Sequence, residues 1–257
     1  MMRILLLGGT SEASRLAVAV ADAGLDAVFS YAGRTAQPVS QPLALRVGGF
    51  GGVEGLVTYL RNERITHVID ATHPFAAQMS SNAVRACGHA GVALCALERP
   101  AWQADTGDRW THLATLEEAV AALPDRGARV FLAIGKQNLS AFAAKPENHY
   151  LLRLVDPPEA PLPLPNTSVE IARGPFDVMG DRSLMQAHGI THVVSKNAGG
   201  SGAEAKLQAA RELGVPVIMI ARPKVPERRV LASVEQVMGW LRGGADHEVA
   251  SPAERGV

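Results

Sequence analysis

The chain lacks the features that mark secreted, membrane-spanning and metal-binding proteins. Its 257 residues include only two cysteines, Cys87 and Cys95, which are not in a metal-ligand spacing. We therefore expect buried free thiols and no metal site. No apolar run approaches the roughly 20 residues that span a bilayer. These absences lead us to expect a cytoplasmic protein with no membrane partner.

A net charge of either sign is also absent, because 25 basic residues balance 25 acidic ones. A general nucleic-acid or membrane-surface binder needs a positive field, and this composition argues against one. It remains compatible with a local basic pocket. The length suffices for one large domain or two small ones with a sizeable core. The sequence leaves the oligomeric state open between a monomer and a weak dimer.

What the chain does contain is the same unit twice. The matched segments come in the same order and at nearly the same offset, and one pair shares the run Ile-Thr-His-Val. The pairs are residues 3–7 with 129–135, residues 65–70 with 190–195, and residues 91–100 with 214–223. Chance similarity between buried Val/Ile-rich strands is the alternative. Two long matches in register favour duplication.

Buried apolar runs alternate with helical patterns along both halves. The runs predict strands at residues 3–7, 26–31, 43–47, 66–70 and 92–97, and again at 129–134, 149–155, 169–173, 191–195 and 215–221. Amphipathic stretches predict helices at residues 12–23, 53–63, 115–123, 136–144, 203–213 and 233–242, with others after Pro74 and Pro175. Five prolines make residues 156–166 a loop or an extended connector.

Strands that alternate with helices predict an α/β fold with parallel sheets. We expect two Rossmann-like halves, related by duplication, with a ligand cleft where their strand ends meet. The predicted boundaries are an N-terminal domain at residues 1–98, a C-terminal domain at residues 99–242 and a disordered tail at residues 243–257.

The turn between the first strand and the first helix is the first candidate site. Gly8, Gly9, Thr10 and Ser11 offer backbone N–H groups to a phosphate, at a helix N-terminus that favours negative charge. The full G-x-G-x-x-G fingerprint is absent, so a plain strand–helix turn is the alternative. Its position after the first strand of an α/β half supports the phosphate interpretation.

The end of the second strand bears on which dinucleotide would bind. Ser30 and Arg34 occur there without a carboxylate. An acidic residue at this place selects NAD, whereas an arginine accommodates the 2′-phosphate of NADP. We therefore predict NADPH as the cofactor of residues 1–98. A solvated surface arginine is the alternative.

The fourth strand of the first half leads into a second candidate loop. We expect Ala71 and Thr72 to line the cofactor site. His73 is a candidate proton donor, because the pKa of histidine lies near neutrality. Alternatively, Thr72 or His73 merely caps the following helix. His67 and His192 begin equivalent strands, and we interpret them as structural.

The equivalent loop of the second half is the strongest candidate in that half. Lys196, Asn197, Gly199 and Gly200 combine a cation, an amide and a backbone that a ligand can approach closely. Lys196 can bind a carboxylate or a phosphate, and Lys136 is a second cation at a strand end. A flexible surface loop is the alternative.

Four segments together carry a resemblance to a known family. They are Ile-Leu-Leu-Leu-Gly-Gly-Thr-Ser-Glu at residues 4–12, Asp-Ala-Thr-His-Pro-Phe-Ala at residues 70–76, Ala-Arg-Gly-Pro-Phe at residues 172–176, and Ser-Lys-Asn-Ala-Gly-Gly at residues 195–200 with Glu204 and Lys206. Over residues 3–241 the chain resembles the precorrin-6A reductase family of cobalamin biosynthesis. Each segment alone is unspecific, whereas the four together are specific.

The resemblance implies an NADPH-dependent enzyme that reduces one double bond of the precorrin-6A macrocycle to give precorrin-6B. It also implies two Rossmann-like halves, with cofactor and tetrapyrrole substrate in the cleft between them. The family has a metal-free branch and a cobalt-bound branch, and these motifs do not separate the two. The residues are also compatible with an NADPH reductase for another small acidic substrate and with a non-catalytic NADP- or tetrapyrrole-binding protein.

The implied macrocycle carries many acetate and propionate groups, so we expect cations in its site. The candidate substrate-binding residues are Lys136, Arg153, Arg173, Asn197, Gly199 and Gly200. Arg173 has a serious alternative as a solvated surface charge. We expect Lys196 to orient the substrate, and the group that gives the proton is left open, with His73 as the candidate.

Overall fold

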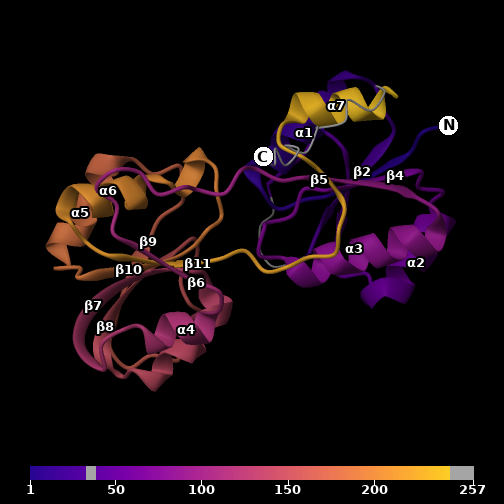
Figure 1. Ribbon diagram of the computed structural model, residues 1–257. Coiled ribbons are helices and arrows are strands. Elements are labelled where there is room, and N and C mark those ends of the chain that lie inside the picture. The colour runs from indigo at the N-terminus through magenta and orange to yellow at the C-terminus, as the bar shows by residue number, and fades with distance from the viewer. Residues whose placement is uncertain (33–38, 244–257) are drawn as a thin grey trace, which may run out of the picture. The chain divides into compact units, whose positions relative to one another are not determined.

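The computed structural model describes residues 1–32 and 39–243, which form two compact units (Figure 1). The first unit is built from Met1–Arg99 together with residues 225–243, and the second unit from Pro100–Lys224. The polypeptide therefore passes from one unit to the other twice. Arg34 and the predicted tail beyond residue 243 lie outside the described residues.

The first unit is a six-stranded parallel sheet with helices on both faces. Its order is β12-β5-β4-β1-β2-β3, which is the Rossmann order 3-2-1-4-5-6 read from the other edge. The strands are β1 (Ile4–Leu7), β2 (Ala27–Tyr31), β3 (Ala44–Val47), β4 (His67–Asp70), β5 (Ala93–Leu97) and β12 (Arg229–Leu231). In Figure 1, α1 (Ser11–Asp22) and α7 (Val234–Leu241) lie on one face, and α2 (Gly52–Asn62) and α3 (Ala77–Ala90) on the other.

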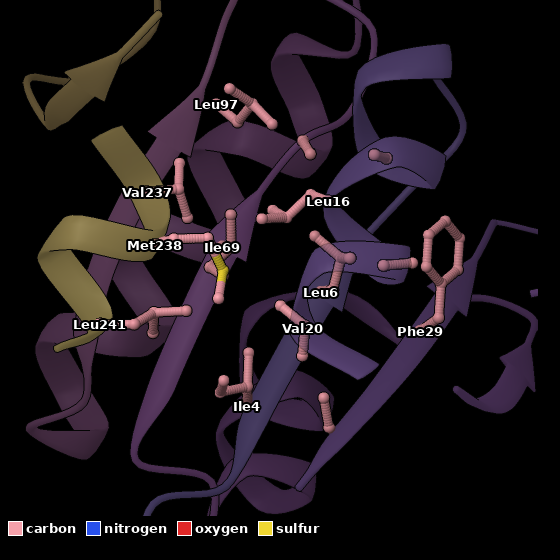
Figure 2. Close-up of a cluster of buried hydrophobic side chains, with 14 of the residues drawn as sticks. Ile4, Leu6, Leu16, Val20, Phe29, Ile69, Leu97, Val237, Met238 and Leu241 are labelled. Atoms are coloured by element: carbon pink, nitrogen blue, oxygen red, sulfur yellow. The ribbon is translucent and has the colours of Figure 1, made fainter. Parts of the chain in front are cut away.

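Burial on both faces explains why such short apolar runs form strands. All four residues of β1 are buried, because a parallel sheet covered by helices has no solvent side. Leu5 and Leu7 pack in the cluster formed with α2 and α3. Figure 2 shows the opposite cluster, in which Val237, Met238 and Leu241 of α7 are directed toward the sheet and α1. The C-terminal helix therefore completes the core of the first unit.

The second unit repeats this arrangement. Its parallel order is β6-β11-β10-β7-β8-β9. The strands are β6 (Trp110–Leu113), β7 (Arg126–Ala133), β8 (Glu147–Leu154), β9 (Thr167–Ile171), β10 (His192–Lys196) and β11 (Val217–Ile220). In Figure 1, α5 (Val178–Ala187) and α6 (Ala205–Leu213) lie on one face and α4 (Leu116–Ala121) on the other. Two 3₁₀ helices complete the unit, η1 (Lys136–Ala144) and η2 (Ser201–Ala203).

Side-chain contacts repeat along with the sheet order. Thr66 Oγ1 lies 2.9 Å from the Nδ1 atom of His67, and Thr191 Oγ1 lies 2.9 Å from the Nδ1 atom of His192. Each threonine hydroxyl also accepts, at 3.0 Å, the backbone N–H of the arginine opposite it. The predicted α/β fold with two parallel-sheet halves is confirmed, and the ligand cleft predicted between the halves stays a prediction.

The sixth strand of each sheet is the one that a simple tandem repeat would place in the other sheet. β6 follows β5 in sequence but pairs with β11, whereas β12 follows β11 and pairs with β5. The two segments match, with Leu-Ala-Thr-Leu-Glu-Glu at residues 113–118 and Leu-Ala-Ser-Val-Glu-Gln at residues 231–236. Thr115 caps α4 and Ser233 caps α7 in the same way. The duplicated halves thus exchange equivalent strand–helix segments.

This exchange makes the predicted C-terminal domain, residues 99–242, wrong at its end. Residues 225–242 belong to the first unit, because β12 extends its sheet and α7 fills its core. Two details also differ from prediction. The helix expected at residues 136–144 is the 3₁₀ helix η1, and α3 begins at Ala77, so Pro74 lies in the preceding turn.

The paired strand-start histidines predict a pH dependence of stability. Burial lowers the pKa of His67 and of His192. The folded chain therefore binds fewer protons than the unfolded chain near the ordinary histidine pKa, and stability falls as the pH drops through that value and below it. We expect the urea midpoint to decrease between pH 7.5 and pH 5.5, and the decrease to be smaller in the His67→Gln, His192→Gln variant. An equal decrease in both proteins would contradict this assignment.

Candidate functional site

The turn from β1 into α1 has one tightly packed glycine and one open glycine. The N–H of Gly8 donates to the carbonyl of Ser30 at 3.0 Å. A Cβ added at Gly8 would lie 2.0 Å from the Cζ atom of the buried Phe29 ring. Gly9 has a φ of +128°, and a Cβ there would meet nothing within 4 Å. Gly9 is exposed, so its backbone is open to approach by a phosphate.

Thr10 joins this turn to the end of β4. Its Oγ1 atom accepts the N–H of Ala13 at 3.1 Å, which caps α1, and donates to the carbonyl of Ala71 at 2.9 Å. Ser11 begins α1 and is exposed. The structure therefore brings together the predicted cofactor residues of two separate loops, and their contacts with a cofactor stay predictions.

The loop after β4 is organised by a buried carboxylate. Asp70, which is 3% exposed, accepts the N–H and the hydroxyl of Thr72 at 3.2 and 2.7 Å. The Nδ1 atom of His73 accepts the N–H of Phe75 at 3.2 Å. A neutral His73 ring therefore carries its proton on Nε2. α3 has no side-chain cap, so neither Thr72 nor His73 caps that helix.

A pocket opens at the carboxyl ends of β1, β4 and β5. Its lining residues are Thr10, Glu12, Thr72, Pro74, Leu97, Glu98 and Arg99. Glu12 and Arg99 pair at 2.7 Å, with side chains 12% and 18% exposed. Burial acts to raise the pKa of Glu12, but its own backbone N–H, Arg99 and Ser11 outweigh burial and lower that pKa. The wall of the pocket therefore holds an ionised pair beside two threonines.

A second buried ion pair lies behind this pocket and involves residues 225–243, the segment that returns to the first unit. Arg228 donates to Glu98 at 2.8 Å, and its Nε atom lies 3.9 Å from Asp70 Oδ2. That nitrogen and that oxygen have no hydrogen-bond partner. Sequence reasoning assigned no role to Glu12, although it ends the segment 4–12 that carries the family resemblance. Arg99 and Arg228 were not predicted, since no local motif marks a residue whose partner lies on a distant segment.

In the second unit, Lys196 ends β10 and points to the 3₁₀ helix η1. Its Nζ atom donates to Asn138 Oδ1 at 2.6 Å. Lys136, at the start of η1, is exposed, and Lys196 is half-buried. Asn138 was not predicted from the sequence, although it lies two residues after Lys136. Lys136 and Lys196 thus follow or end the neighbouring strands β7 and β10.

The glycine-rich loop after β10 is held by the segment that opens the second unit. Asn197 accepts the N–H of Trp102 at 2.8 Å and donates to its carbonyl at 3.0 Å. A Cβ added at Gly199 would lie 2.0 Å from the carbonyl oxygen of Pro100. The Trp102 indole donates to the carbonyl of Gly200 at 2.9 Å. These three predicted substrate residues fix the loop, and their contact with substrate stays a prediction.

The two predicted arginines of the second unit differ in their surroundings. Arg153 forms a buried ion pair with Asp181, and its guanidinium lies 4.0 Å from the ring centroid of Phe176. Its Nε atom has no hydrogen-bond partner. Arg173 is exposed in the loop after β9. Arg153 thus has a carboxylate of its own chain, and its predicted role toward substrate stays a prediction, as does that of Arg173.

The cysteines and the acidic side chains offer no metal centre in the part of the chain that is described. No group of three or more His, Cys, Asp or Glu side chains there could hold an ion. Burial raises the pKa of Cys87 and of Cys95 to about 12, so both remain thiols at neutral pH. Within the same residues, no helix is long and apolar enough to cross a membrane.

Two parallel sheets in Rossmann order, with an open glycine turn into α1, define a two-domain α/β protein of the Rossmann type. The profile of the family described as precorrin-6x reductase CbiJ/CobK matches residues 3–242. The chain therefore belongs to the precorrin-6x reductase family and is an oxidoreductase. The family resemblance inferred from four sequence segments is confirmed.

Individual relatives agree with this assignment. The chain is 67% identical to a precorrin-6A reductase from Rhodobacter capsulatus, over 96% of this chain and 97% of the relative. A solved structure described as CobK precorrin-6A reductase has a TM-score of 0.91 and 66% identity, covering 95% of this chain and 97% of that one. A cobalt-precorrin-6A reductase from Priestia megaterium is 33% identical, over 93% and 97% of the two chains.

Proposed function

We propose that this protein reduces one double bond of precorrin-6A with a hydride from NADPH, giving precorrin-6B. The observation that carries the proposal is the family match over nearly the whole chain. The geometry of the first unit supports it, because an open glycine turn leads into a capped helix at the central strand. The more similar of the reported relatives is named for the metal-free substrate, so metal-free precorrin-6A is the substrate proposed first.

The residues present fit a dinucleotide. Gly9 leaves space that a Cβ would otherwise occupy, beside the N-terminus of α1. The pocket lined by Thr10 and Thr72 lies at the carboxyl ends of the central strands, where such folds bind ligands. When bound there, NADPH supplies the hydride and the protein supplies position and electrostatics. In the Rossmann arrangement, Gly9 and Thr10 would hold the pyrophosphate.

Reduction of a carbon–carbon double bond adds one hydride and one proton. His73 is the proposed proton source in its imidazolium form, because the pKa of histidine lies near neutrality. Giving one proton to the macrocycle leaves the neutral ring, whose Nδ1 atom accepts the N–H of Phe75. Lys196 is proposed to bind a substrate carboxylate, in an orientation set by Asn138. Lys136 and Arg173 are exposed and would add positive charge for further carboxylates of the macrocycle.

The decisive experiment mixes the protein, NADPH and precorrin-6A and follows the absorption of cofactor and macrocycle together. Equal losses of NADPH and of precorrin-6A establish the reductase. If NADPH is consumed only with the cobalt-bound macrocycle, the cobalt branch is correct. Binding of NADPH without consumption in either case would instead leave a non-catalytic binding protein.

Replacing Lys196 by alanine is expected to reduce kcat/KM for precorrin-6A roughly 10- to 100-fold, because a charge-assisted hydrogen bond to substrate is lost. NADPH affinity should not change. Asn138→Ala should raise KM with a smaller effect, since the lysine remains but is no longer held. The control is Arg182→Ala, which breaks the exposed ion pair between Arg182 of α5 and Glu212 of α6. Normal kinetics for Lys196→Ala would remove this residue from the mechanism.

A further inference from the structure

An arginine that the sequence analysis did not single out lies beside the end of β2. Arg46 on β3 is the register partner of Ser30, and its Nη1 atom donates to Ser30 Oγ at 3.4 Å. Ser30 is 4% exposed and is followed by only one further residue of β2. In Rossmann folds the end of the second strand faces the adenosine ribose. Arg46 is therefore a cation at the place where NAD and NADP are distinguished.

The guanidinium of Arg46 is held in one orientation. Its Cζ atom lies 3.7 Å from the ring centroid of Phe50 and 5.2 Å from that of Tyr59. Its Nη1 atom donates to the carbonyl of Gly48 and its Nη2 atom to that of Gly49. These bonds and the bond to Ser30 use three of the five N–H donors of an arginine. Within residues 1–32 and 39–243, the other two donors form no hydrogen bond, which leaves them for a ligand.

No carboxylate among the described residues forms an ion pair with Arg46. Most other arginines at comparable depth have such a partner, for example Arg99 with Glu12 and Arg228 with Glu98. A half-buried charge without a counterion is costly, and an anionic ligand would remove that cost.

The loop after β3 leaves room for such a ligand. A Cβ added at Gly48, Gly49, Gly51 or Gly52 would meet nothing within 4 Å. Gly51 is the N-cap residue of α2 and provides no side-chain cap. An exposed Glu54 lies in the first turn of that helix and already balances its positive end. Arg46, and not the N-terminus of α2, is therefore the group that would attract an anionic ligand here.

We propose that Arg46, together with Ser30, binds the 2′-phosphate of NADPH and makes the enzyme prefer NADPH to NADH. The proposal rests on the proposed cofactor and names the residue that selects it. The planar guanidinium would offer its free donors to phosphate oxygens, and the hydroxyl of Ser30 would offer one more hydrogen bond. Arg46 is thus a specificity-determining residue of the first unit.

The test measures dissociation constants of NADPH and NADH by fluorescence titration, so it does not depend on turnover. Arg46→Met keeps an unbranched side chain against Phe50 while removing the charge. We expect NADPH binding to weaken roughly 10- to 100-fold with NADH binding unchanged. Arg61→Met on α2 is the matched control, since that arginine is exposed and its side chain donates to the carbonyl of His89. Melting temperatures show whether each variant is folded.

Two results would overturn the proposal. Arg46→Met could keep the full preference for NADPH, in which case a loss of preference in Arg34→Ala would assign the role to that residue instead. Alternatively, Arg46→Met could weaken the binding of both cofactors equally, which would indicate a purely structural role. A wild-type protein that binds neither cofactor would contradict the proposed function itself. Failure of the Arg46 assignment and failure of the function are therefore distinguishable.

Discussion

Replacing Gly8 by alanine is expected to abolish NADPH binding and to lower the melting temperature. The new Cβ would lie 2.0 and 2.1 Å from two carbons of the Phe29 ring, which is fully buried and cannot swing into solvent. Overpacking of a well-packed site costs roughly 1–3 kcal/mol or forces the backbone to move. Because the N–H of Gly8 bonds to Ser30, that movement would distort the turn that we propose to bind phosphate. Titration with NADPH and thermal melting measure the two effects.

A compensating substitution tests the cause of this loss. Phe29→Leu removes the ring atoms that the new Cβ would meet, so Gly8→Ala combined with Phe29→Leu should regain stability and part of the NADPH affinity. Phe29→Leu alone should show only the modest loss of a smaller core side chain. If Gly8→Ala binds NADPH and melts like the wild type, the close approach of Phe29 is not a constraint on this turn.

Ending the chain after Lys224 is expected to leave the first unit unfolded. The truncated chain lacks β12 and the three buried side chains of α7, namely Val237, Met238 and Leu241. Burial of three such side chains contributes roughly 5–9 kcal/mol, which approaches the whole net stability of a domain. We expect rapid proteolysis within residues 1–99 and rapid hydrogen exchange in β1 and β4. A cooperative melting transition of the first unit in the truncated chain would contradict this expectation.

A circularly permuted chain tests whether the first unit needs residues 225–243 themselves or their covalent connection to the second unit. Residues 225–243 can be placed before Met1 through a flexible linker of about 20 residues, which spans about 25 Å on average. This chain should recover protection of β1, since β12 and α7 are present again. The point variant Leu241→Ala should cost roughly 2–5 kcal/mol. Arg242→Ala, at an exposed neighbour, should stay within about 0.5 kcal/mol of the wild type.

Most of the fold could be predicted from the sequence because its signals are local. Buried runs such as residues 3–7 have no polar alternation, which is typical of central parallel strands, and the repeated Ile-Thr-His-Val segment identified both halves. β6 and β12 gave no such signal, since they are short edge strands of four and three residues. Their pairing with distant strands could not be read from local pattern. The domain boundary was wrong for the same reason.

The residues of the candidate site likewise divide into those that local sequence indicates and those that only the structure reveals. Gly8, Thr72 and Lys196 follow strand ends, where position alone indicates a ligand site. Asn138, Arg99 and Arg228 are important only through partners elsewhere in the chain, so no spacing in the sequence points to them. Arg46 lay in a predicted strand, and its interest arises from the register that places it opposite Ser30.

Because the edge segments are exchanged, synthesis of the first unit begins before that of the second unit but is completed after it. The first unit starts to emerge from the ribosome first, but its last strand and covering helix are made only after the entire second unit. At roughly 5–20 residues per second, the edge of β5 waits on the order of ten seconds for β12. The strand made immediately after β5 is β6, which the finished fold pairs with β11. The nascent chain therefore leaves β5 and β6 unpaired with each other, and the edge of β5 stays open until β12 has been made.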